Sequence, residues 1–387
     1  MIRRIACIAA SASFAVAAPV AAVEKNEVEI VNIRIGQGDA TLIRGPADAQ
    51  GKRVTVLFDA GDDKDYDGSR IIAAVLSKRN IKHIDYVVIS HYDADHIGGL
   101  ITERGRHGTS FLFGYNGVPG AAGDDDRDGR VDWEGQPDQD PDPQELGLGD
   151  DISVGSFIDR GDENNKNTIQ YQRYVKIAAA RGARISLDTQ AKLDSFAIDL
   201  GSGARMTPYA SAGRVRGATA KVPKVDTENE QSVSMLVTYG KFDFLVSGDL
   251  IGRAAGAEDA QVERAVGAKI AAAGRIVDVL HVNHHGANNA SDDVFLGQIK
   301  PTIAVISHGD VDSYRHPNVN ALRRLEEAGV YRIIQTKWGT TDVAMSNREI
   351  KDIQAIYQGD VVVTGDGNDY TVSTSRTYRA DVNPRRP

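Results

Sequence analysis

The chain of 387 residues contains one cysteine, Cys7. Cys7 lies in an N-terminal segment that we predict to be removed, so the mature chain would contain no thiol. This scarcity excludes a disulfide bond, a cysteine metal ligand and a cysteine nucleophile in the mature protein. It is compatible with an oxidising compartment.

The sequence also has few long apolar runs, and the N-terminal one has the features of an export signal. Arg3 and Arg4 precede an apolar run over residues 5–18, and small residues follow up to Ala22. The pattern is typical of a secretory signal peptide and is too short and alanine-rich for a stable membrane span. We predict a signal peptide over 1–22, no transmembrane segment in the mature chain, and a periplasmic or secreted protein.

Positive charge is not in excess, since the formal net charge is -9. Most of the surplus acidity falls between Gly123 and Asp151, where acidic residues far outnumber Arg127 and Arg130. The rest of the chain is close to neutral, so overall charge neither directs the protein to nucleic acid nor excludes it. The hydrophobic content of 41% is ordinary for a globular chain, and the length suffices for one large α/β domain.

The densest group of polar residues follows an apolar, β-branched run at residues 87–89, which predicts a buried strand. The residues that follow within one short loop are His91, Asp93, Asp95 and His96. Imidazole and carboxylate ligands suit Zn²⁺, Mn²⁺ or Fe, and the absence of thiolate argues against a purely structural zinc. Four ligands this close are more than one ion needs from one loop, so we predict two metal ions.

This motif resembles the His-x-His-x-Asp-His motif of the metallo-β-lactamase fold, with Asp93 where the second histidine is expected. With an aspartate at this position, the motif resembles that of the hydrolase domain of the ComEC-type competence proteins. Other segments agree in the same order, namely residues 35–40, 58–61, 246–249, 284–286 and 314–317. The resemblance implies an α/β protein, an αββα sandwich over residues 23–387.

The resemblance also implies a set of metal ligands. Asp249, at the end of a hairpin predicted over 229–249, would bridge both metals. His284 and His285 follow a strand predicted over 276–283, and in an extended backbone they cannot both point the same way. One would ligate and the other would line the cleft, and the sequence leaves open which. The first metal would take His91 and Asp93 with one of these histidines, and the second would take Asp95 and His96.

Further residues are predicted to support the site. Asp59 ends a strand predicted over 54–58 and can accept a hydrogen bond from a ligating imidazole. Asp39 either buttresses the site or closes a glycine-rich turn, and Asn229 matches the family pattern before Asp249. Asp95 and His316 are the catalytic candidates; His316 would contact a substrate phosphate, supply a proton or have a structural role.

Residues from about 105 to 206 do not follow the compact spacing of the family, and we predict an insertion there. Its first part is rich in Gly, Pro and Asp, and a helix at 168–181 is expected to form a cap beside the cleft. The insertion contains a partial EF-hand-type pattern with Gly129 at the sixth position, but Gly135 stands where the bidentate glutamate belongs. A calcium loop and a solvated acidic loop therefore remain alternatives. The candidate calcium ligands are Asp124, Asp126, Asp128, Asp132 and Glu134.

These features predict a secreted hydrolase with two divalent metal ions, Zn²⁺ or Mn²⁺, that uses a metal-bridging hydroxide. The extra negative charge of Asp93 favours a harder ion such as Mn²⁺. The resemblance implies phosphodiester substrates, with nucleic acid as one candidate. Two alternatives remain: a lactone or β-lactam amide hydrolase, and a non-catalytic metal-binding module in which the acidic insertion is the working part.

Overall fold

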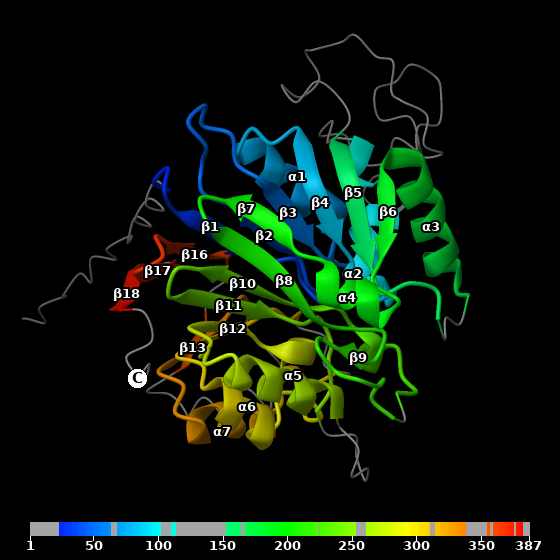
Figure 1. The fold of residues 1–387 in the computed structure, drawn as a ribbon. Helices are drawn as coiled ribbons and strands as arrows, with labels where there is room; N and C mark the ends of the chain where they lie inside the picture. Colours follow the sequence, from blue (N-terminus) through cyan, green and yellow to red (C-terminus); the bar gives the residue numbers. More distant parts are fainter. Residues whose placement is uncertain are drawn as a thin grey trace, which may run out of the picture.

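The computed structural model describes residues 23–62, 68–101, 110–113, 152–163, 167–223, 225–252, 261–309, 314–337, 354–356, 359–374 and 377–381. Within these residues two nine-stranded sheets form the centre of the molecule, and helices flank them (Figure 1). The predicted signal peptide over 1–22 and the candidate calcium ligands between 124 and 134 lie outside the described residues.

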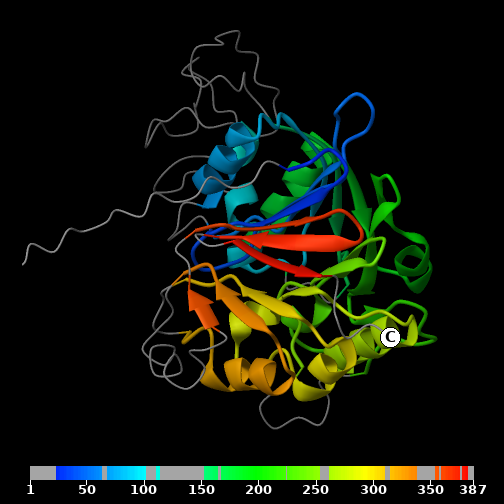
Figure 2. The ribbon, with the colours of Figure 1, turned by 90° about the vertical axis from the view of Figure 1, so that its left-hand side faces the viewer.

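The first sheet joins the two ends of the chain. Its strands are, in spatial order, β18 (Thr377–Asp381), β17 (Asp369–Ser373), β16 (Val361–Gly365), β1 (Val28–Asn32), β2 (Thr41–Arg44), β3 (Thr55–Phe58), β4 (His83–Val88), β5 (Ser153–Asp159) and β6 (Ala183–Ser186). β16 and β17 lie beside β1 (Figure 2). Strands β3 to β6 are parallel, so the loops that follow them leave from one edge.

The second sheet also contains a parallel group. Its strands are, in spatial order, β15 (Gln354–Ile356), β14 (Arg332–Gln335), β13 (Ile303–Ile306), β12 (Val279–His281), β11 (Phe242–Val246), β10 (Ser234–Tyr239), β8 (Ala204–Ser211) and β7 (Ile198–Gly201), with β9 (Arg214–Val215) paired to β8. Strands β11 to β15 are parallel. Their carboxyl ends therefore meet at one edge, where ligands bind in many α/β proteins.

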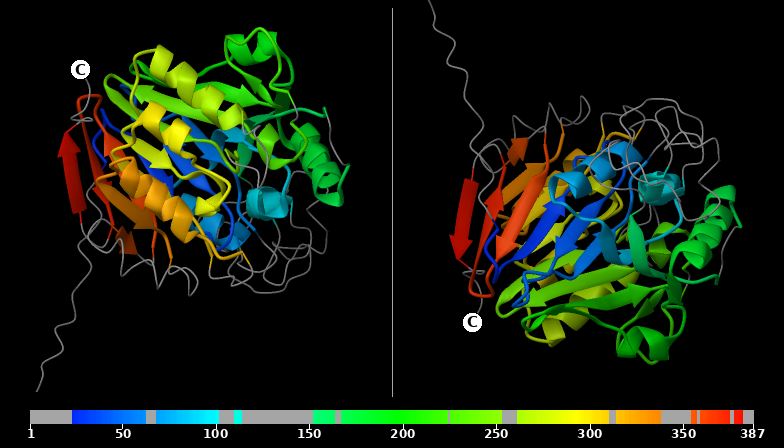
Figure 3. Two further views of the ribbon diagram at one scale, coloured as in Figure 1. Left: turned by 90° about the horizontal axis from the view of Figure 1, so that it is seen from below. Right: turned by 90° about the horizontal axis from the view of Figure 1, so that it is seen from above.

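Three apolar clusters hold the layers together. Buried side chains such as Phe58, Met235 and Phe244 fill the space between the sheets. A second cluster packs beneath α1 (Gly68–Lys78), α2 (Ala94–Ile101) and α3 (Ile169–Arg181). A third packs beneath α5 (Gln261–Ala272), α6 (Asp293–Ile299) and α7 (Val319–Glu327), the helices in front of the second sheet in the view from below (Figure 3). This arrangement confirms the predicted α/β sandwich.

Most of the predicted elements are present. Strands β3, β4 and β12, the hairpin of β10 and β11, and helix α3 lie where the patterns place them. The short helix α4 (Gln190–Ser195) and the helix α6 were not predicted. The remaining helical turns are η1 (Phe111–Phe113), η3 (Asn229–Gln231) and η4 (Asn283–Gly286).

Two features differ from the sequence expectations. Helix α2 begins at Ala94, within the segment that the sequence presents as one short loop, so Asp95 and His96 lie in its first turn. The described residues after Ile152 do not form a separate cap, because β5 and β6 extend the first sheet and β7 and β8 join the second. Helix α3 packs against β5 and α2, with Thr168 accepting a hydrogen bond from the Tyr171 N–H.

Over the described ranges, no helix has both the length and the apolar character that a membrane span requires.

Candidate metal centre

The predicted ligands come from three segments that end at the same place. His91 follows β4, Asp249 follows β11, and His284 and His285 follow β12. Since these strands belong to the parallel parts of the two sheets, their carboxyl ends bring the segments together. The structure therefore places together residues that are up to 194 positions apart in the chain, as the distances below show.

Asp59 and Ser90 fix the orientation of two imidazoles. Asp59 Oδ1 accepts the Ser90 N–H at 2.7 Å, and Asp59 Oδ2 lies 2.9 Å from His96 Nδ1. Ser90 Oγ donates to Asp59 Oδ2 at 2.7 Å and lies 2.9 Å from His91 Nδ1. Each imidazole therefore uses Nδ1 within this network and keeps Nε2 for another partner, the arrangement in which carboxylates support metal-binding histidines.

Asp249 lies between two groups of side chains. Its Oδ1 is 3.1 Å from His96 Nε2 and 3.5 Å from His285 Nε2. Its Oδ2 is 3.5 Å from His284 Nε2. Gly248 just before it has φ 52°, and a Cβ there would lie 2.5 Å from the Ser90 Cβ. Glycine thus permits the close approach of this turn to the β4 loop, which brings one carboxylate oxygen to each group.

The two adjacent histidines differ from the sequence expectation. His284 and His285 have φ of 50° and 51°, so the backbone is left-handed and not extended. Because alternation applies only to extended backbone, both Nε2 atoms approach the same carboxylate from this turn. His285 Nδ1 lies 3.1 Å from the Ser307 carbonyl oxygen and can donate to it, which leaves Nε2 toward the cluster.

The two aspartates of the motif face different partners. Asp95 Oδ2 lies 3.4 Å from His285 Nε2, and its Oδ1 lies 3.9 Å from His96 Nε2. Asp93 Oδ2 lies 3.6 Å from His91 Nε2, and its side chain is 51% exposed. Asp95 thus joins the group around Asp249 Oδ1, while Asp93 and His91 form the more open side of the centre.

Asp39 lies on the far side of His285. Its Oδ1 is 3.5 Å from His285 Nδ1 and 3.5 Å from His281 Nε2, and the residue is buried. Ligand atoms of Asp39, His96, Asp249 and His285 all lie within 4.8 Å of one another. His281 was not singled out from the sequence, and its one signal was a histidine inside an apolar strand.

The remaining candidates lie at the rim. Asn229 Nδ2 is 3.3 Å from His284 Nε2. The His316 ring centroid lies 5.5 Å from that of His284 and 5.6 Å from that of His285. His308 Nδ1 and Nε2 lie 2.7 Å from the Gly309 carbonyl oxygen and 3.1 Å from Gln335 Oε1, so both of its ring nitrogens are engaged away from the cluster.

In the cluster, carboxylates and imidazoles stabilise each other's charged forms. Burial alone would raise the pKa of Asp249, but His285 and His96 beside it hold that pKa well below its usual range. Burial likewise opposes charge on His96, yet Asp249 and Asp95 raise the pKa of its imidazole. At the rim, burial together with the neighbouring His285 and His284 lowers the pKa of His316 to about 3.

Several buried polar atoms in the centre have no hydrogen-bond partner among the residues that the structure describes. They are His91 Nε2, His96 Nε2, His285 Nε2, Asp249 Oδ1 and both carboxylate oxygens of Asp39. A buried polar atom without a partner costs about 1–3 kcal/mol, so such atoms are rare and need an explanation. Unpaired imidazole nitrogens and carboxylate oxygens that face one another fit divalent metal ions.

Comparison with known proteins agrees with this geometry. Residues 33–153 match the family model of the metallo-beta-lactamase superfamily. The chain is 22% identical over 338 residues to ComE operon protein 3 of Bacillus subtilis (strain 168), which covers 84% of this chain and 34% of the relative. It is 32% identical over 104 residues to competence protein ComA of Neisseria gonorrhoeae, which covers 27% and 14%. The aligned region is thus about a third of the relatives' length or less.

Solved structures of low sequence similarity were also found. A metal-dependent hydrolase of the beta-lactamase superfamily is 13% identical, with a TM-score of 0.36, over 86% of this chain and 97% of the other. A diphosphatase from the PhnP family is 12% identical, with a TM-score of 0.37, over 87% and 97%.

Proposed function

We propose that this chain, which matches the metallo-β-lactamase superfamily model over residues 33–153 and is similar to the ComEC-type competence proteins, hydrolyses phosphodiester bonds with two divalent metal ions. The observation that supports this most is the convergence of unpartnered imidazole nitrogens and carboxylate oxygens around Asp249. A nucleic acid is one candidate substrate. Secretion or a periplasmic location, which the N-terminal sequence predicts, belongs to the same proposal.

The residues would divide between two ions. His91, Asp93 and His284 would hold the first, Asp95, His96 and His285 would hold the second, and Asp249 would offer one oxygen to each. The three carboxylates make the ligand set rich in oxygen. Such a set favours Mn²⁺ more than a set made only of histidines would. Bound divalent ions lower the pKa of water to near neutrality and polarise phosphoryl oxygens.

The protein's own residues set the geometry. Asp59 accepts from His96 and, through Ser90, orients His91, so neither ring needs to reorganise. The Ser307 carbonyl oxygen does the same for His285, and Asp39 Oδ1 lies 3.5 Å from the Nδ1 of that ring. His316 at the rim has a buried Nδ1 without a hydrogen-bond partner among the described residues, and we expect it to bind a substrate oxygen.

The open side of the centre supports a substrate that approaches from solvent. Asp93 is half exposed, whereas His91, His96 and His285 are buried. Asp95 lies between His96 and His285, and its side chain is 28% exposed. It would position the second ion rather than react with the substrate.

The test uses the purified mature protein with bis(4-nitrophenyl) phosphate and added Mn²⁺ or Zn²⁺. We expect turnover that EDTA abolishes and that Asp249→Asn lowers by at least about 1,000-fold, because one carboxylate would hold both ions. Nitrocefin and a simple lactone serve as the competing substrates. Turnover of either of these without the phosphodiester would contradict the proposal, and turnover of none would favour a binding module.

A further inference from the structure

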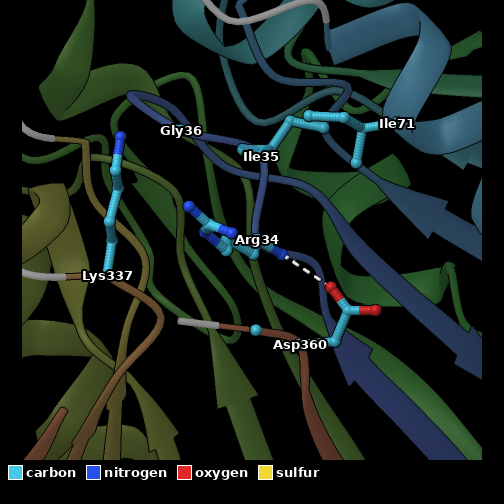
Figure 4. A pocket seen from close by; sticks show the side chains of 7 residues that line it. Arg34, Ile35, Gly36, Ile71, Lys337 and Asp360 are labelled. Atoms are coloured by element: carbon cyan, nitrogen blue, oxygen red, sulfur yellow. Dashed lines mark hydrogen bonds between the residues drawn. The ribbon is translucent and has the colours of Figure 1, made fainter. Parts of the chain in front are cut away.

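A pocket with two cationic side chains lies beside the metal centre. Its volume is about 420 Å³, and its walls come from the loop after β1, from α1 and from the segments after β14 and before β16. Ile71 and Lys337 lie on opposite sides of the pocket, with Arg34 between them (Figure 4). Neither cation belongs to the ligand set above, so the pocket needs its own explanation.

The charges in the pocket favour an anionic ligand. Within the described residues, the Arg34 guanidinium makes no hydrogen bond and no ion pair. Asp360 also lines the pocket, but its Oδ1 accepts the backbone N–H of Arg34 at 3.0 Å and does not pair with the guanidinium. Guanidinium and ammonium groups both bind phosphate oxygens through charge-assisted hydrogen bonds.

The position of the pocket relates it to the metal centre. Lys337 follows β14 at the edge where His285 follows β12, and only β13 separates the two strands. Neighbouring strands are about 4.8 Å apart, so these two strand ends are roughly 10 Å apart. On the other side, Gly36 of the pocket and Asp39 of the cluster belong to one loop.

Gln37 lies in the sequence between Gly36 of the pocket and Asp39 of the cluster. Gln37 Oε1 accepts the Gly309 N–H at 3.3 Å and joins the β1–β2 loop to the segment after β13. A ligand that reaches both the pocket and the metal centre would need two separate anionic groups, one for each site.

We propose that Arg34 and Lys337 form a subsite for a second phosphate of the substrate. The inference rests on the proposed phosphodiesterase activity, with one phosphodiester at the metal centre and a further phosphate in the pocket. It narrows the substrate class to molecules in which carbon-containing units separate successive phosphates, as in a nucleotide chain. Ile71 supplies an apolar wall for such a unit.

Two chromogenic substrates test the subsite. Thymidine 5′-(4-nitrophenyl phosphate) has one phosphate, and its 3′-phosphorylated derivative has a second one. With Mn²⁺-loaded wild-type protein we expect KM for the derivative to be about tenfold lower, the low end of what charge-assisted hydrogen bonds contribute. Arg34→Gln and Lys337→Gln should each remove most of this difference and leave kcat and KM for the first substrate unchanged.

Matched controls separate the pocket from overall charge. Arg205 and Lys241 are exposed cations elsewhere, and Arg205→Gln and Lys241→Gln should leave both KM values as in wild type. Thermal melting checks that each variant is folded, and having two pocket variants keeps the test valid when one of them misfolds.

A binding measurement makes the test independent of turnover. Calorimetry with thymidine 3′,5′-bisphosphate and the metal-loaded protein should show about tenfold weaker binding for Arg34→Gln and Lys337→Gln than for wild type. If neither chromogenic substrate is hydrolysed but this difference appears, the proposed activity fails and the anion subsite stands. Equal affinities, or equal KM ratios in wild type and both variants, would overturn the subsite.

Discussion

Buried Arg160 and partly exposed Glu228 form an ion pair that contacts the loop containing His91. The Arg160 Nε and one terminal nitrogen donate to the two oxygens of Glu228 at 2.8 and 2.7 Å, and Arg160 is fully buried. Glu228 Oε1 also accepts the Tyr92 N–H at 3.0 Å. One carboxylate therefore connects the segment after β5 to the backbone between the ligands His91 and Asp93.

Removing one partner of this pair should destabilise the protein strongly. Arg160→Met would leave Glu228 without its two charge-assisted hydrogen bonds. Because the Glu228 side chain is 13% exposed, we expect a loss of about 2–3 kcal/mol, less than for a fully buried charge. Urea unfolding should show that loss of stability. Lys192→Met is the control, because Lys192 pairs with Asp188 on the surface, where an ion pair is worth less than about 1 kcal/mol. Similar losses in both variants would contradict this account.

A hydroxyl should determine metal affinity without contacting the metal. Ser90→Ala removes the group that links Asp59 to His91 Nδ1, so the ring loses its orientation. Loss of such a supporting contact typically weakens metal binding by about 10–100-fold. Titration of Mn²⁺ into chelator-treated protein measures this directly. Ser211→Ala, which removes another buried hydroxyl, should leave the affinity unchanged, and an equal loss there would count against the proposed link.

The local part of the site could be predicted from residue spacing, and Asp249 with His284 and His285 from the family resemblance, but other long-range contacts could not be predicted. The His91 to His96 motif stands within six residues behind an apolar strand, so its spacing is visible in the sequence. The contacts of Tyr92 with Glu228 and of Asp39 with His281 join residues far apart in the chain, and no local pattern encodes such pairs. The role of Ser90 was invisible for the same reason.

The backbone at His284 and His285 shows a second limit. Two consecutive non-glycine residues with positive φ are strained by about 1–3 kcal/mol each, and only surrounding contacts can hold them. Sequence patterns assume the common extended geometry and therefore predicted divergent side chains. Strands β5 to β8 were missed because the unusual spacing of residues 105–206 suggested an insertion, although β5 pairs with β4 as part of the sheet.

The stability of the metal-free protein should fall as the pH rises, whereas the stabilisation by added metal should grow. Without metal, the neighbouring carboxylates raise the pKa values of His96 and His285 above 6.5 despite burial. Their contribution is therefore complete below about pH 6.5 and is lost as the pH rises through the folded-state values. Metal ions compete with these protons, so stabilisation by added Mn²⁺ should increase with pH, reaching about 3 kcal/mol at a hundredfold excess over Kd.

Thermal melting between pH 6 and pH 9, with EDTA or with Mn²⁺, measures both effects. Asp249→Asn should show a smaller pH dependence in EDTA and little stabilisation by Mn²⁺, because it removes a charge that both imidazoles face. An EDTA-treated wild-type protein that becomes more stable as the pH rises over this range would contradict the assignment of these charges.

Glu263 should make a separate contribution to pH-dependent stability below pH 7. It is fully buried in α5 and accepts hydrogen bonds from Asn283 Nδ2 at 2.6 Å and from the Ser291 N–H at 2.7 Å. Burial, reinforced by the charge of Asp292, raises the pKa of its carboxyl to about 7. Because this pKa is above the unfolded value, its contribution to stability is complete below pH 4.5 and is lost as the pH rises to about 7.

Each pKa unit corresponds to about 1.4 kcal/mol of stability. A pKa of about 7 for Glu263 in the folded protein would therefore lower the unfolding free energy by about 3 kcal/mol between pH 4.5 and pH 7. Glu263→Gln cannot ionise and keeps an oxygen for Asn283, so its unfolding free energy should change less between pH 5 and pH 7 than that of wild type. Urea unfolding of the two proteins in EDTA measures the difference, because the contributions of His96 and His285 are common to both and cancel in the comparison. If wild type and Glu263→Gln respond identically to pH, the carboxyl titrates in the normal range, and hydrogen bonds from its neighbours outweigh its burial.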